Sequence, residues 1–124
     1  RRPWTADVAS VLREALAFSL SNGAHAVGAF DDVHLVGISA WRVLPGGDWD
    51  SFVLAVATGH RRRGIGRMLK ENLLAMAQNA GALGVRSVVS IDNIAMENLN
   101  ESLGAETMAD PSDKRFMLAY IALR

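Results

Sequence analysis

Residues 52–57 (FVLAVA) and residues 60–66 (HRRRGIG) form the stretch that decides how this chain folds. The first run is apolar and rich in β-formers, and the second ends on Gly64 and Gly66, directly before a segment with helical periodicity. Such glycines let the backbone turn tightly and approach a ligand closely, and the N–H groups that open the helix attract an anion. A strand, a phosphate-binding turn and a helix are therefore expected. Taken alone, the glycine pattern is more typical of a plain tight turn between a strand and a helix.

Hydrophobic periodicity places the other elements. A first helix is expected from a Thr5 cap to Asn22-Gly23, and a second over residues 64–80, with Lys70 on its polar face. Strands are expected at 24–30, 34–44 and 49–57 as an antiparallel meander, and at 85–91 as a parallel neighbour of the strand 49–57. A last helix at 95–102 and a C-terminal hairpin ending in 115–123 complete the chain. This order predicts an α/β fold in which a mixed sheet carries helices on both faces.

Length and composition limit the class of protein. The chain has 124 residues, half of them hydrophobic, which predicts one domain spanning 1–124. Its 13 basic and 13 acidic side chains cancel, so binding of nucleic acid or membrane by bulk charge is not expected. Cysteine is absent, which excludes disulfides and a thiolate nucleophile, and the three histidines show no metal-ligand spacing, so no metal is expected. The lack of a bilayer-length apolar run and of a signal peptide predicts a soluble, cytoplasmic protein.

Two motifs in this order resemble the GNAT acetyltransferase superfamily. Arg61-x-x-Gly64-x-Gly66, between a strand and a helix, is similar to the acetyl-CoA motif of that family. Asn93, followed after a short helix by Leu103-Gly104-Ala105, is similar to its closing pattern. The resemblance implies a GNAT-like acyl-CoA N-acyltransferase fold. Family members open with a strand ending in Arg-Pro, so the opening Arg1-Arg2-Pro3 implies that this first strand is incomplete.

The resemblance also implies a cosubstrate and the residues that bind it. Acetyl-CoA is expected to place its pantetheine arm along the backbone of Val56 and Ala57 and its pyrophosphate on the N–H groups of residues 61–66. Arg61 and Arg67 are the expected charge partners of the phosphates. Asn93 is expected either to bond the cosubstrate or to cap the helix after it, and the two roles are compatible. The expected cosubstrate-binding set is Val56, Ala57, Arg61, Arg62, Arg63, Gly64, Ile65, Gly66, Arg67 and Asn93, with Arg62 and Arg63 facing water.

The same resemblance identifies two positions for acid–base chemistry. Asp50 lies fourteen residues before Gly64, where the histone-acetyltransferase branch carries its glutamate base; a solvated strand-end carboxylate is the alternative. Asn100 stands seven residues after Asn93, where many members place the tyrosine that protonates the departing thiolate, and asparagine is no acid.

Two functions therefore stay open. One is direct N-acetyl transfer from acetyl-CoA to a primary amine, and the other is a non-catalytic acyl-CoA-binding or regulatory module. The expected partners are a coenzyme A thioester and an amine-bearing acceptor, with no nucleic acid and no membrane; a homodimer is left open.

Overall fold

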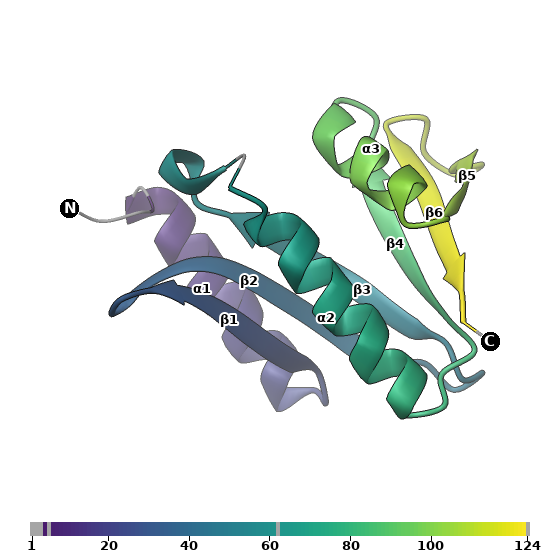
Figure 1. Ribbon diagram of the computed structural model, residues 1–124, viewed down its shortest axis with the longest axis horizontal. Coiled ribbons are helices and arrows are strands. Elements are labelled where there is room, and N and C mark those ends of the chain that lie inside the picture. Colours follow the sequence, from purple (N-terminus) through teal and green to yellow (C-terminus); the bar gives the residue numbers. More distant parts are fainter. Residues whose placement is uncertain (1–3, 5, 62, 124) are drawn as a thin grey trace. The chain divides into compact units, whose positions relative to one another are not determined.

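The computed structural model describes residues 4, 6–61 and 63–123 (Figure 1). Arg1-Arg2-Pro3, the expected cap Thr5 and Arg62 lie outside the described residues. The elements along the chain are α1 (Ala6–Ser21), β1 (His25–Asp31), β2 (His34–Val43), β3 (Trp49–Val56), the short 3-10 helix η1 (Thr58–His60), α2 (Ile65–Asn79), β4 (Gly84–Ser90), α3 (Ile94–Ser102), β5 (Glu106–Ala109) and β6 (Phe116–Ala122). The strands form one mixed sheet in the order β1-β2-β3-β4-β6-β5. The expected α/β class is confirmed.

The described residues of 1–42 and 53–73 form one compact unit, called here the first unit. Its strands β1 and β2 make an antiparallel hairpin, closed by the pair Asp31 and His34. Helix α1 lies behind these strands and α2 in front of them in Figure 1. Every residue of β2 from Val36 to Trp41 is buried, without the alternation of a half-exposed strand, because both faces of β2 are covered.

Helix α2 packs closely on this hairpin because β2 carries a glycine beneath it. A Cβ atom at Gly37 would come within 3.0 Å of the side chains of Ile65 and Leu69. Leu69 forms a buried cluster with Val36 and Ala29. The absence of a side chain at Gly37 therefore sets how near the start of α2 lies to the sheet.

The described residues of 43–52 and 74–124 form the second unit. In it, β3 pairs in parallel with β4 from Trp49↔Val85 to Ser51↔Ser87, which confirms the expected parallel pairing. Strand β6 pairs antiparallel with β4 and with β5, as expected for a C-terminal hairpin. A Cβ at Gly84 would collide with the phenol of Tyr120, whose hydroxyl donates to Asp48 Oδ1 at 2.8 Å.

Element boundaries agree with the sequence-based expectation to within two residues. Helix α2 starts at Ile65 and not at Gly64, because Gly64 has a φ of +78°, outside the helical region. Trp41 in β2 and Trp49 in β3 are buried and belong to the core. None of the described helices combines the length and the apolar character needed to cross a membrane.

Candidate functional site

The turn between β3 and α2 lies entirely in the first unit. After Val56, Ala57 closes the strand: its N–H donates to Val36 O at 2.9 Å, and its carbonyl accepts from His60 N at 2.9 Å. Gly64 then turns the chain, and its carbonyl accepts from Met68 N at 3.0 Å to open α2. Since the N–H groups of a first helical turn have no carbonyl within the helix to bond, this turn presents donors and the positive end of the helix dipole.

Space is left open at both glycines of this turn. A Cβ built on Gly64 meets nothing within 4 Å, and one built on Gly66 meets only Val56 Cγ2, at 3.7 Å. Position 64 requires glycine because its φ is positive. Gly66 lies in the helix without a positive φ and without crowding, where alanine would be more stable by about 1 kcal/mol. The protein's own packing therefore does not explain Gly66, and the open space beside it suits a ligand.

The described arginines of the turn all have partners inside the first unit. Arg61 Nε donates to Val56 O at 3.3 Å, at the end of β3. Arg63 Nη1 lies 2.8 Å from His60 Nδ1 and 3.7 Å from Asp31 Oδ2. Arg67 Nη1 lies 3.6 Å from Glu71 Oε2, one helical turn on. Arg63 is exposed, as expected, but it is also tied to the β1–β2 hairpin.

The position of Lys70 on α2 differs from the sequence-based expectation. It was expected on the polar face of the helix, yet the residue is only 1% exposed. Burial lowers the pKa of its ammonium to about 8, because the charged form is disfavoured away from water. Lysine is seldom fully buried, so its charge predicted an exposed position on this helix, and that prediction is wrong. The first unit therefore holds a buried cation one turn after Gly66.

Asp50 lies in the second unit, as the second residue of β3. It is 5% exposed, and its Oδ1 lies 3.5 Å from Arg86 Nε on the neighbouring strand β4. The alternative of a solvated strand-end carboxylate is therefore wrong. The ion pair between Asp50 and Arg86 could not be predicted from the sequence, because it depends on the register of β3 and β4.

Asn93 precedes α3 and Asn100 lies within it, both in the second unit. Asn93 is the N-cap, and its Oδ1 accepts from Met96 N at 3.1 Å, which confirms the capping role. Asn100 is 1% exposed, and neither its Oδ1 nor its Nδ2 has a partner among the described residues. An unpartnered buried carboxamide is destabilising and is commonly found where a ligand or a water supplies the missing hydrogen bonds.

Asn100→Leu is expected to raise the free energy of unfolding of the ligand-free protein by about 1–3 kcal/mol, because it removes two unpartnered polar atoms and keeps the branched shape of the side chain. Chemical denaturation measures the change. Asn98→Leu, at an exposed position of the same helix, is the control and should stay within about 0.5 kcal/mol of the wild type. A destabilised Asn100→Leu protein would mean that the carboxamide is satisfied inside the folded chain.

The sequence matches the family model described as the acetyltransferase (GNAT) family over residues 2–105. The fold is similar to solved acetyltransferases at low sequence identity. One is a protein provisionally named an acyl-CoA N-acyltransferase from Klebsiella pneumoniae (TM-score 0.77, 18% identity, 100% of this chain and 94% of that one). Another is the PaiA N-acetyltransferase from Thermoplasma acidophilum, solved in complex with coenzyme A (TM-score 0.75, 19% identity, 90% and 69%).

An acetyltransferase from Thermus thermophilus has the same TM-score as the Thermoplasma protein, 0.75, at 20% identity, with 91% of this chain and 73% of that chain covered. No curated protein matches the sequence significantly. The family match spans both units of the chain, and the fold agrees with it. The chain belongs to the GNAT acetyltransferase family.

Proposed function

We propose that this protein is an N-acetyltransferase that moves the acetyl group of acetyl-CoA directly to a primary amine. The observation that carries the proposal is the open turn at Gly64 and Gly66, at the start of α2. A glycine that neither φ nor packing requires leaves the first helical turn accessible to a bulky anion, and the diphosphate of coenzyme A is such an anion. The family relationship supports a coenzyme A thioester as the cosubstrate.

The first unit would bind the cosubstrate through backbone N–H groups and through one side chain. Backbone N–H groups of the first turn of α2 would bond the diphosphate. The exposed guanidinium of Arg61 would exchange the Val56 carbonyl for a phosphate oxygen, which forms a charge-assisted bond. That exchange would also free the Val56 carbonyl for an amide of the pantetheine arm. Both backbone groups of Ala57 are already bonded within the first unit, so Val56 is the better partner of the two.

Direct transfer forms a C–N bond to the acceptor amine and breaks the thioester C–S bond, and the amine loses one proton. Because the chain has no cysteine, no acyl-cysteine intermediate is available. Asp50 is the proposed acceptor of the proton, directly or through water. Asn100 cannot return a proton to the thiolate, so water is the proposed donor there. Asp50 is therefore the side chain proposed for proton transfer, and Asn100 only marks the position where the family commonly has the acid.

Asp50→Asn is expected to lower the acetylation rate at neutral pH by about a hundredfold, the lower end of what a general base contributes. The rate should recover toward alkaline pH, since more of the free amine is then already deprotonated. Rates across pH 6–10 measure this. Arg86→Gln is the matched control: it breaks the same ion pair but leaves the carboxylate in place. A pH profile for Asp50→Asn that overlays the wild type would remove Asp50 from the mechanism.

Incubation with acetyl-CoA and a panel of primary amines, followed by free-thiol detection, tests the proposed function. Thiol release above the rate without enzyme, together with an acetylated amine detected by mass spectrometry, is the expected result. The non-catalytic module remains the second candidate, because Asn100 stands where a proton-donating side chain is common in the family. Calorimetric binding of coenzyme A without turnover across the panel would favour the module.

A further inference from the structure

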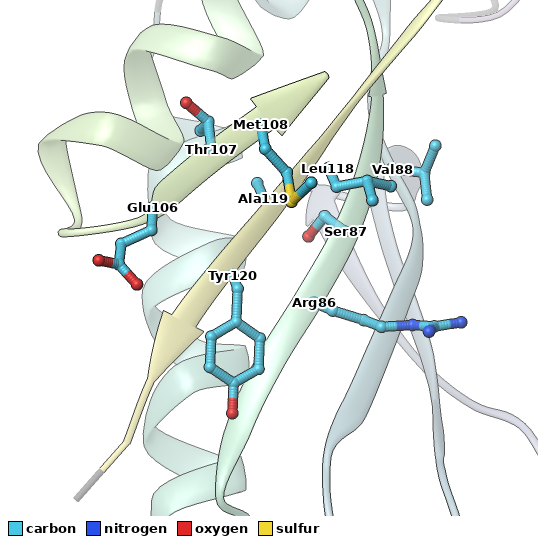
Figure 2. A pocket seen from close by; sticks show the side chains of 9 residues that line it. All are labelled: Arg86, Ser87, Val88, Glu106, Thr107, Met108, Leu118, Ala119 and Tyr120. Carbon is cyan, nitrogen blue, oxygen red and sulfur yellow. The ribbon is translucent and has the colours of Figure 1, made fainter. Parts of the chain in front are cut away.

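One face of the second unit carries side chains in two cross-strand rows (Figure 2). The strand registers pair Asp50 with Arg86, Arg86 with Tyr120, and Tyr120 with Glu106. The next row pairs Val88 with Leu118, and Leu118 with Met108. Residues paired directly across strands point to the same face, and rows two residues apart are separated by about 6.6 Å. A polar row therefore runs beside an apolar one.

Most of these side chains line a cavity of about 410 Å³, which we call the outer-face cavity. Its volume lies in the range that small ligands occupy. Val88 and Met108 remain 52% and 58% exposed, so the apolar part is accessible from solvent. Figure 2 shows Arg86 and Glu106 extending to opposite sides of Tyr120, with Met108, Leu118 and Val88 at the other end. The cavity thus has an apolar wall and a charged end.

The charge at that end is negative. The Arg86 guanidinium lies 3.5 Å from the Asp50 carboxylate, which balances its charge. The Tyr120 hydroxyl donates to Asp48 Oδ1, a further carboxylate at this edge. Within the described part of the chain, Glu106 forms no ion pair. A cation that reaches the cavity would find the Glu106 carboxylate as its partner and the Tyr120 ring beside it.

We propose that the outer-face cavity binds a small primary monoamine with an apolar body. The ammonium lies at Glu106, and the body lies on Val88, Leu118 and Met108. The spacing of the two rows suits a body of about four to six carbon atoms. This binding does not depend on the proposed function. A polyamine fits less well, because the apolar wall offers its further ammonium groups no partner.

Hexylamine is the probe, with hexanol as its neutral analogue and hexanoate as its anionic one. The full chain without coenzyme A is titrated by NMR, and amide shifts at β5 and β6 report the site. Hexylammonium should bind about fivefold more tightly than hexanol, as expected for a partly exposed ion pair, and hexanoate more weakly than both. In Glu106→Gln the preference for hexylammonium over hexanol should disappear, while hexanol binding stays the same.

Glu101→Gln removes an exposed carboxylate of α3 that does not line the cavity, and it should keep the preference for hexylammonium. Leu118→Asn should weaken hexylamine and hexanol alike. Equal binding of hexylammonium in the wild type and in Glu106→Gln, or shifts confined to other elements, would overturn the proposal. Coenzyme A is titrated into the same samples: binding of coenzyme A without any amine response overturns this inference alone, and an amine response without coenzyme A binding overturns the proposed function alone.

Discussion

Lys70→Met is expected to raise the free energy of unfolding by about 3 kcal/mol at pH 7, from the lowered pKa of about 8 and the conversion of one pKa unit to about 1.4 kcal/mol. Methionine has a similar length and flexibility and needs no hydration. The wild-type protein keeps an ammonium group in a position that is 1% exposed, and this desolvation destabilises the folded state. Few single substitutions in a small domain stabilise it this much.

The effect of Lys70→Met should depend on pH in one direction. The unfolded chain binds the lysine proton up to its ordinary pKa of about 10.5, and the folded chain only up to about 8. Between these values the unfolded state carries more protons, so wild-type stability rises with pH. The advantage of Lys70→Met is therefore complete below pH 8, shrinks between pH 8 and 10.5, and is absent above.

Urea denaturation of the wild type and Lys70→Met at several pH values measures this difference. Lys114→Met, at an exposed position of the loop before β6, is the control and should be neutral at every pH. A gain that is the same at pH 7 and pH 10.5 would mean that better apolar packing, and not the buried charge, stabilises the variant.

Gly66→Val is expected to weaken coenzyme A binding on the order of 100-fold, about 2.7 kcal/mol, because its side chain occupies the space that the first turn of α2 leaves open. Gly66→Ala should separate binding from stability. Its methyl group meets only Val56 Cγ2 at 3.7 Å, so the fold should gain about 1 kcal/mol from the better helix former, while coenzyme A affinity falls about tenfold. The two measurements should move in opposite directions.

Calorimetry with coenzyme A and thermal denaturation without it give the two readouts. Gly46→Ala is the matched control, because a Cβ at Gly46 also meets nothing within 4 Å but belongs to the turn before β3. It should leave coenzyme A affinity unchanged. If Gly66→Ala stabilised the protein and bound coenzyme A as tightly as the wild type, the phosphate-binding role of this turn would be wrong.

Features set by short stretches of chain were readable from the sequence. The pattern from Arg61 to Gly66 specifies a strand, a turn and a helix because a positive φ at Gly64 and an open first helical turn are local properties. The cap at Asn93 is equally local, since its side chain bonds an N–H three residues on. Periodicity also placed the helices and strands, and the order of elements was enough to expect β3 and β4 to be parallel.

Contacts between distant residues were decided by the tertiary structure. The charge of Lys70 predicts a place on the polar side of its helix, and only the packing of α2 shows that the residue is buried. The carboxylate of Asp50 lies beside Arg86 through the register of β3 and β4, 36 positions apart in sequence numbering. Glu106 joins the same row through two further strand pairings, and no local pattern indicates it. A shift of one residue in any of these registers would turn the side chain to the opposite face, so the polar row exists only in the folded sheet.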